Sequence, residues 1–215
     1  MPTQSNEHPN LWVFEHPVIQ DKLTKIRDVS TAHASFRSLL NEIAGLMFFQ
    51  LSRRFNTVDV EIQSPLEITT GSKLADPITL VPILRAGVGM TDGILSVIPE
   101  ARIGHIGLYR DEETKKPIPY YSKLPADIAQ GPVLLIDPML ATGGSASHAA
   151  TVLQEHGCGA VQMVCLVASP EGVRRMAQDH PCLPIYTASL DRCLNQNGYI
   201  LPGLGDAGDR IFGTT

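Results

Sequence analysis

Apolar side chains recur at steps of three and four residues over the first quarter of the chain. Between Lys22 and Phe55 these positions include Leu23, Ile26, Phe36, Leu40, Ile43, Met47 and Leu51. This spacing places the apolar side chains on one face of an α-helix. We expect two helices here, divided near Ser30–Thr31, where a hydroxyl side chain would cap the second helix.

After Val58 the pattern changes to short apolar runs that alternate with segments of helical spacing. The β-prone runs are Ile78–Leu84, Ile103–Tyr109, Val133–Ile136, Val161–Val167 and Ile185–Thr187. The helical segments between them are 90–97, 145–155 and 171–178. Such alternation is typical of a parallel sheet whose strands are joined by crossover helices. We therefore expect an α/β fold with an open parallel sheet flanked by helices.

Three segments depart from this alternation. Residues 1–10 are polar, contain two prolines and are expected to form a loose arm. Residues 110–125 combine charges with prolines, which central strands exclude, and this predicts a flexible hairpin or lid. Residues 195–215 contain five of the 18 glycines, so this backbone either is disordered or approaches something closely. For 215 residues we expect a single domain, 1–215, that carries all three segments.

The charge balance argues against a nucleic-acid or membrane partner. Lys and Arg total 17 against 22 Asp and Glu, which gives a net charge of −5, and no run is rich in Lys or Arg. A protein that binds nucleic acid or an anionic membrane needs a basic face. The chain has no stretch of 18 apolar residues, and its first ten residues do not resemble a signal peptide. We therefore expect a cytoplasmic protein.

The most specific chemistry lies in Val133–Ser145, VLLIDPMLATGGS, where an apolar strand leads into an acid, a turn and a helix. Gly143 and Gly144 allow consecutive N–H groups to face one anion, and Thr142 and Ser145 add hydroxyl donors. The N-terminus of the following helix adds its positive dipole end. These features predict a cradle for a monophosphate. The alternative is an ordinary strand-to-helix loop in which the glycines only form the turn.

A second candidate site lies at the end of the preceding strand. In Ile83–Gly89 an apolar run ends in Arg85-Ala86-Gly87, which would bring a fixed cation to the ligand edge of the sheet. Arginine binds phosphate well because two of its N–H groups can donate at once. The alternative is a surface arginine at a strand end. No GxxxxGK[ST] pattern occurs in the chain, which disfavours a nucleoside triphosphate loop of that type.

Several segments in register resemble the uracil phosphoribosyltransferase family. DPMLATGGS is similar to the 5-phosphoribosyl-1-pyrophosphate loop in the form that the uracil enzymes use. The further matching segments are HPVIQDKL near the N-terminus, ILRAGVGM at 83–90, LYRDEET at 108–114, PYYSKLP at 119–125 and GYILPGLGDAGDR at 198–210. One such match would be weak. Together, in matching order and spacing, they cover nearly the whole chain after residue 10.

The resemblance implies a phosphoribosyltransferase-type sheet with a β-hairpin arm and a C-terminal base-binding hood. It implies that the donor's phosphate and ribose are bound by Asp137, Pro138, Met139, Leu140, Ala141, Thr142, Gly143, Gly144 and Ser145. Arg85 is implied to bind the pyrophosphate, and Arg110 to reach it as the arm at 110–125 closes and excludes water. Many relatives carry two successive acids where this chain has Asp137 followed by Pro138. The second acid is therefore expected from elsewhere, and Asp206 is our candidate.

The tail at 195–215 is implied to select the base. Uracil offers two carbonyl acceptors and an N–H, so backbone groups can recognise it if glycines let the chain come close. The resemblance places Ile200 and the Gly205-Asp206-Ala207 turn against uracil, with the Asp206 carboxylate turned toward the donor or its metal. The expected cofactor is Mg²⁺, held through oxygens of the substrate and not by a set of protein ligands, with Asp206 as the side chain that could reach it.

The implied reaction joins uracil to the ribose of 5-phosphoribosyl-1-pyrophosphate and yields UMP and pyrophosphate, a step of pyrimidine salvage. Arg85, Arg110, Asp137 and Asp206 are implied to carry it by positioning and by neutralising charge. Three alternatives stay open: a transferase for another base, a nucleotide-sensing RNA-binding homologue, and a catalytically silent scaffold. The sequence also leaves open GTP as an effector and a homo-oligomer, either a dimer or a tetramer, to which the helices at 22–55 could contribute an interface.

Overall fold

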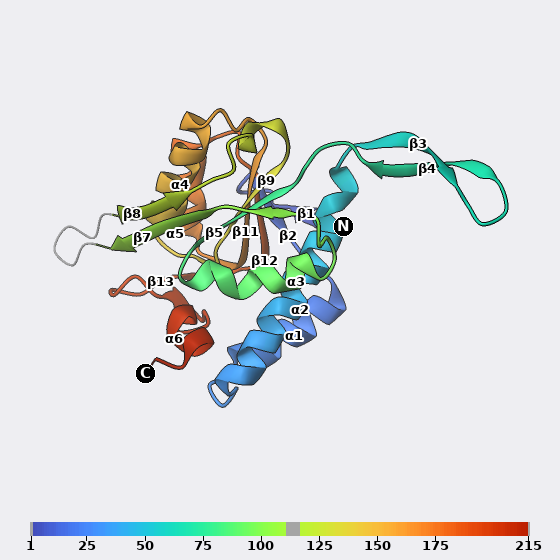
Figure 1. Ribbon diagram of the computed structural model, residues 1–215. Helices are drawn as coiled ribbons and strands as arrows, with labels where there is room; N and C mark the ends of the chain where they lie inside the picture. Colours follow the sequence, from blue (N-terminus) through green and yellow to red (C-terminus); the bar gives the residue numbers. More distant parts are fainter. Residues whose placement is uncertain (1, 111–116, 215) are drawn as a thin grey trace.

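A computed structural model describes residues 2–110 and 117–214 of the protein. Its main sheet has the strand order β1-β2-β12-β11-β9-β5-β7-β8 (Figure 1). Neighbouring strands from β2 to β7 are parallel, and β1 and β8 are antiparallel at the two edges. The strands are β1 (Thr3–Gln4), β2 (Leu11–Val13), β5 (Thr79–Leu84), β7 (His105–Arg110), β8 (Pro117–Lys123), β9 (Val133–Ile136), β11 (Val161–Ala168) and β12 (Ile185–Leu190). The expected open parallel sheet is confirmed.

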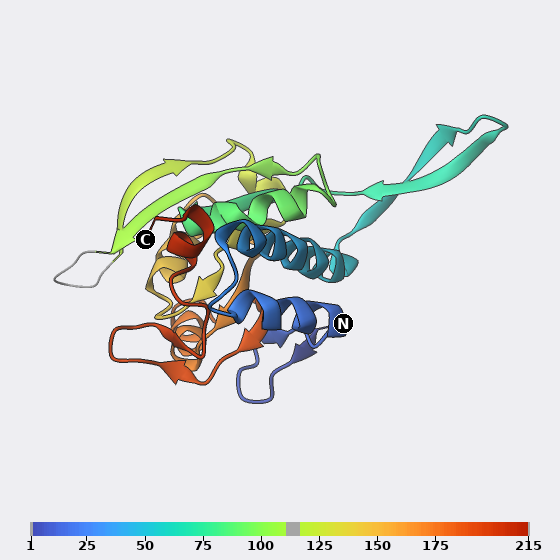
Figure 2. The ribbon, with the colours of Figure 1, turned by 90° about the horizontal axis from the view of Figure 1, so that it is seen from below.

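Helices cover both faces of this sheet (Figures 1 and 2). One face carries α1 (Pro17–Arg27), α2 (His33–Leu51) and α3 (Thr91–Leu95), and the other carries α4 (Gly144–Glu155) and α5 (Pro170–Asp179). Because side chains alternate along a strand, Leu134 and Ile136 of β9 pack with α1 to α3, whereas Val133 and Leu135 pack with α4 and α5. Burial on both faces explains why the central strands are continuous apolar runs. Short elements between these are η1 (Ser52–Arg54), β6 (Arg102–Ile103) and η3 (Ile128–Gln130).

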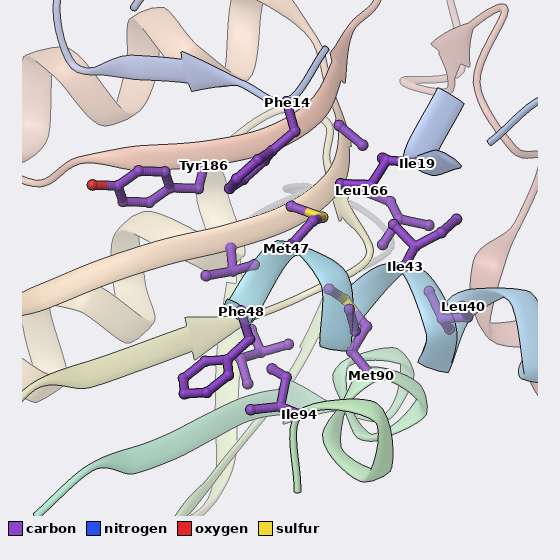
Figure 3. Packing of buried hydrophobic residues seen from close by; sticks show 14 of the residues in the cluster. Phe14, Ile19, Leu40, Ile43, Met47, Phe48, Met90, Ile94, Leu166 and Tyr186 are labelled. Atoms are coloured by element: carbon purple, nitrogen blue, oxygen red, sulfur yellow. The ribbon is translucent and has the colours of Figure 1, made fainter. Parts of the chain in front are cut away.

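The larger core lies between α2 and the sheet (Figure 3). Leu40, Ile43 and Met47 of α2 are fully buried and have the spacing that the sequence predicts for the inner face of a helix. Across from them Phe14 packs against Tyr186, with ring centroids 6.2 Å apart. Each such side chain stabilises the fold by roughly 1.5–3 kcal/mol on burial. The sheet therefore gives the loops at its edge a rigid support.

The ends of the first two helices differ from the expected ones. α1 begins at Pro17 and not at Lys22, because a proline fits the first turn of a helix, where its missing N–H is not needed. The expected hydroxyl cap on α2 is wrong. This helix follows Ala32 and has no side-chain cap, and the Thr31 hydroxyl instead donates to the Lys25 carbonyl oxygen, 2.6 Å away, at the end of α1.

A hairpin that the sequence analysis did not identify projects from the body of the molecule (Figures 1 and 2). It consists of β3 (Thr57–Gln63) and β4 (Ile68–Leu74), which pair antiparallel. In the turn, the Ser64 hydroxyl oxygen accepts hydrogen bonds from the N–H groups of Leu66 and Glu67. Both strands are mostly exposed, so the hairpin has apolar side chains that the rest of this chain does not cover.

Two of the three segments that depart from the alternation of strands and helices contain strands. Residues 3–4, within the expected loose arm, form β1 and pair with β2, so this part of the N-terminus lies on the sheet edge. β7 and β8 pair antiparallel and form the hairpin expected at 110–125. Residues 111–116 and the Arg110 side chain lie outside the described residues. No helix in the described part of the chain has both the length and the apolar character to span a membrane.

Candidate functional site

The two loops that the sequence singled out leave the sheet at the same edge. Pro82 of β5 lies beside Ile136 of β9 in parallel register, so Arg85 and Asp137, which follow these strands, emerge together. After Arg85 the chain enters η2 (Ala86–Met90), which packs directly on the end of β9. A Cβ atom on Gly87 would lie 2.4 Å from the Ile136 carbonyl oxygen, so this close approach requires glycine.

The predicted phosphate loop runs from β10 (Met139–Leu140) to the first turn of α4. Gly143 precedes the helix in the left-handed conformation, with φ +77°. A Cβ atom there would also lie 2.9 Å from the Gly172 carbonyl oxygen. Because Gly143 has no side chain to cap α4, the first-turn N–H groups remain suited to an anion. Thr142 is exposed at this end of the helix, and Gly144 and Ser145 are partly exposed.

The phosphate loop is fixed by hydrogen bonds from residues that the sequence analysis did not select. The Ser169 hydroxyl donates to the Ala141 carbonyl oxygen at 2.6 Å, and its backbone N–H donates to the Leu140 carbonyl oxygen at 2.9 Å. The same hydroxyl oxygen accepts from the Gly172 N–H and so caps α5. The Ser169-Pro170 pair is a helix-start signal that could have located this support.

Asp137 occupies the end of β9, directly before the phosphate loop. It is partly buried, and its backbone N–H donates to the Val164 carbonyl oxygen at 3.2 Å. Burial raises the pKa of the Asp137 carboxyl to about 7, although a backbone hydrogen bond from Met139 acts in the opposite direction. Near neutral pH this side chain can therefore change between an acid and a carboxylate that accepts hydrogen bonds from hydroxyl groups.

The C-terminal segment forms a separate hood. β13 (Cys193–Leu194) pairs antiparallel with β14 (Ile200–Leu201), and the short helix α6 (Ala207–Phe212) follows. Ile200 and Ala207 are buried, whereas Gly205 and Asp206 are exposed. The Asp206 Oδ1 atom accepts from the Asp209 N–H at 3.0 Å and caps α6. A ligand contact through Oδ2 would leave this cap intact.

The hood lies beside the loop that contains Arg85. A Cβ atom on Gly89 of η2 would lie 3.0 Å from Cδ1 of Ile211 in α6. The exposed Arg85 guanidinium lies 5.8 Å from the centroid of the Phe212 ring. The structure thus brings the Arg85 loop next to the end of β9, which leads into the phosphate loop, on one side and next to the C-terminal hood on the other. No hydrogen bond between described residues joins the two acids, Asp137 and Asp206.

Two further features limit which ligands the site residues could hold. Among the described residues, no three or more His, Cys, Asp or Glu side chains are grouped in a way that could hold a metal ion. The glycines at 203, 205 and 208 have the GxGxxG spacing of dinucleotide loops. Here they join a two-residue antiparallel strand to a six-residue helix, so the parallel βαβ unit that such a loop requires is missing.

Comparison with known proteins gives a consistent result. The family model described as uracil phosphoribosyltransferase matches residues 13–214. The chain is 55% identical over 207 residues to the uracil phosphoribosyltransferase of Streptococcus uberis, and 52% identical over 203 residues to that of Finegoldia magna. Each alignment covers 94% of this chain and 97% of the relative.

Solved structures share the fold of this chain. The AQ2163 protein from Aquifex aeolicus is similar with a TM-score of 0.91 at 33% identity, over 95% of this chain and 99% of that chain. A hypoxanthine phosphoribosyltransferase from Staphylococcus aureus has a TM-score of 0.51 at 13% identity, over 85% of this chain and 84% of that chain, which shows a shared fold. The chain belongs to the uracil phosphoribosyltransferase family.

Proposed function

We propose that this protein transfers the phosphoribosyl group of 5-phosphoribosyl-1-pyrophosphate to N1 of uracil, forming UMP and pyrophosphate in pyrimidine salvage. One observation carries the proposal: the Arg85 loop lies directly against the end of β9, where the phosphate loop begins, and against α6 of the hood. Family membership supports the same reaction. A donor bound along this edge would have its reacting carbon between the phosphate loop and the hood.

The donor's 5′-phosphate would bind to the first-turn N–H groups of α4 and to the backbone and hydroxyl groups of 139–145. The left-handed Gly143 and the close packing of the loop on α5 support this assignment, because both make the loop rigid. Asp137 would accept hydrogen bonds from the ribose hydroxyls, with Pro138 fixing the backbone beside it. Binding energy from the phosphate would then hold the distant reacting carbon in place.

At the anomeric carbon, the bond to the pyrophosphate oxygen would break as the bond to N1 of uracil forms, and the proton of N1 would pass to the departing pyrophosphate. The ribose gains positive charge during this step, and the departing pyrophosphate carries negative charge. Arg85 would neutralise the pyrophosphate, and Arg110 would join it when the arm closes, while the Asp206 carboxylate would face the ribose. Closure would also exclude water, which could otherwise react at the same carbon.

The hood would select the base through its backbone. Gly205 has φ +72°, and the exposed Gly205-Asp206 segment lies between the buried Ile200 and Ala207. Backbone N–H and C=O groups at 205–207 would match the carbonyls and N–H of uracil, and Ile200 would provide an apolar wall. A transferase for another base would need different polar groups here, and family membership disfavours that alternative.

Mg²⁺ would enter with the donor. Magnesium binds through one or two carboxylates together with substrate phosphates, and Asp137 and Asp206 are carboxylates of this kind. When bound, the ion would supply positive charge at the pyrophosphate. The protein's own residues would position the donor and the base.

A pyrophosphate-release assay tests the proposal. The protein is mixed with the donor, Mg²⁺ and, in separate reactions, uracil, cytosine, hypoxanthine, guanine or adenine. Release with uracil alone is expected. Release with a purine and none with uracil would overturn the assignment of the base. A mobility-shift titration with RNA at moderate salt tests the RNA-binding alternative, for which we expect no shift.

We also propose a homo-oligomer. The helices that the sequence suggested as an interface border a shallow groove of about 450 Å³ lined by Val18, Phe49 and Val97, and Phe49 is 61% exposed. Such exposed apolar groups, together with those of the β3–β4 hairpin, favour contact with a second copy. Sedimentation analysis should give a dimer or tetramer.

Activation by GTP is the remaining regulatory prediction, and it is checked by adding GTP to the pyrophosphate assay. A cytoplasmic location stays a prediction.

A further inference from the structure

We propose that the buried ion pair between Arg27 and Asp191 is a positioning device for uracil recognition. The inference rests on the proposed function, because the pair would place the segment that contacts the base. Neither residue belongs to the loops described above. The pair joins three parts of the chain that are far apart in sequence: the end of α1, the end of β12 and the turn around Gly203 in the hood.

The pair is anchored in rigid elements. Asp191 directly follows β12, and its backbone N–H donates to the Ala168 carbonyl oxygen at 2.8 Å. Its side chain is only 2% exposed. Arg27 is the last residue of α1, and it donates from Nη2 to Oδ1 at 2.6 Å and from Nη1 to Oδ2 at 2.8 Å. Such a two-bond contact fixes the relative orientation of the two groups.

The same two side chains bind both polar groups of Gly203. The Gly203 N–H donates to Asp191 Oδ2 at 2.9 Å, and its carbonyl oxygen accepts from Arg27 Nη1 at 2.9 Å. Gly203 has φ +63°, and a Cβ atom there would lie 2.1 Å from the Ile200 carbonyl oxygen. The turn can therefore form only with glycine. The ion pair holds this turn between Ile200 and the segment 205–207, the two parts of the hood proposed to contact uracil.

A second arginine supports the same turn. Arg210 donates from Nη1 to the Leu204 carbonyl oxygen at 3.0 Å and from Nη2 to the Asp28 carbonyl oxygen at 2.7 Å. Consecutive residues of the hood, 203 and 204, are thus tied to the C-terminal end of α1. A change at Arg27 would therefore be transmitted to the backbone next to Gly205.

Asp191 is charged over the range in which an enzyme of this kind would act. Burial alone would raise the pKa of its carboxyl, but hydrogen bonds from Arg27, Ser189 and Gly203 together lower it. The Ser189 hydroxyl donates to Oδ1 at 2.7 Å, so both carboxylate oxygens are satisfied. Removing one partner of a buried pair leaves the other charge without compensation, and the surrounding backbone must shift to solvate it. The Gly203 turn is the part bound to both partners, so we expect it to shift.

Asp191→Asn and Arg27→Lys test the proposal. Each variant keeps a polar side chain of similar size but loses either the carboxylate or the two-bond contact. We expect the KM for uracil to rise about tenfold or more, because hydrogen bonds to charged groups are being lost. The KM for the donor should rise much less than the KM for uracil, since neither residue contacts the phosphate loop that would hold the donor's 5′-phosphate. A folding defect alone would not separate the two constants.

Asp21→Asn is the matched control. It removes one negative charge from the ion pair that Asp21 forms with Lys25, also on α1, and this pair is well exposed and has no hydrogen bond to the described residues of the hood. All kinetic constants of this variant should equal those of the wild type. Should Asp191→Asn fail to fold, Arg27→Lys, which keeps the positive charge, decides the question.

The outcomes separate the two proposals. A wild-type protein that releases no pyrophosphate with uracil would refute the proposed function, and the positioning role with it. An active wild type whose Arg27 and Asp191 variants keep the uracil KM, or raise both KM values equally, would refute the positioning role alone.

Discussion

Asp137 should make the unliganded protein less stable as the pH rises. Burial raises its pKa from 3.8 to about 7, so the folded protein keeps this proton over a range in which the unfolded chain has lost it. Each of these roughly 3 pH units corresponds to about 1.4 kcal/mol, so ionising the buried carboxyl opposes folding by about 4 kcal/mol. The contribution of this carboxyl to the free energy of unfolding is most favourable below pH 4. It declines between pH 4 and 7 and no longer changes above pH 7.

The perturbation is Asp137→Asn, which keeps the shape of the protonated acid but cannot ionise. At pH 8 the variant should exceed the wild type in free energy of unfolding by up to about 4 kcal/mol, and at pH 5 by only about 1–2 kcal/mol. The same variant should bind the donor less well, because an amide is a weaker acceptor for ribose hydroxyls than a carboxylate. Urea denaturation without ligands, at one protein concentration and both pH values, measures the difference.

Glu42→Gln serves as the control in this experiment. The hydrogen bond from Lys22 lowers the pKa of Glu42, so removing this carboxylate should not stabilise the protein at pH 8. The reasoning about Asp137 is refuted if Asp137→Asn is less stable than the wild type at pH 8. It is equally refuted if the advantage of the variant is the same at both pH values.

Three other substitutions test the remaining site assignments. Gly143→Ala should raise the KM for the donor and cost about 1–2 kcal/mol of unfolding free energy, because alanine is strained at φ +77°; kinetics and urea denaturation check this. Arg85→Ala should lower kcat about a hundredfold with an unchanged urea midpoint, because an exposed cation that would face the pyrophosphate is lost. Asp206→Asn should reduce kcat without loss of stability, since asparagine also caps helices; a near-normal rate would remove Asp206 from the mechanism.

The sheet and its phosphate loop could be predicted from sequence because their signals are local. Val133–Ile136 is wholly apolar, and the structure places a strand on the same residues. The glycines that follow it predict a tight turn, and Gly143 indeed has a positive φ. The identity of the donor and the base, in contrast, came from resemblance to a family, since a glycine turn alone does not distinguish one phosphate ligand from another.

Features that depend on contacts between distant segments could not be predicted. Arg27 and Asp191 are 164 positions apart, and nothing near either residue indicates the other. The pKa of Asp137 depends on burial by elements that the sequence does not place around it. The β3–β4 hairpin was missed for a different reason: Val58, Val60 and Ile62 alternate with acids, as in an exposed strand, but no buried run marks the segment.

A crystal structure with 5-phosphoribosyl-1-pyrophosphate, Mg²⁺ and a non-reactive uracil analogue tests the central claim most directly. The account predicts the 5′-phosphate on the N–H groups of 139–145, the pyrophosphate on Arg85 and the analogue against Ile200 and 205–207. A phosphate bound elsewhere, with the 139–145 loop empty and the hood turned away from the analogue, would contradict it.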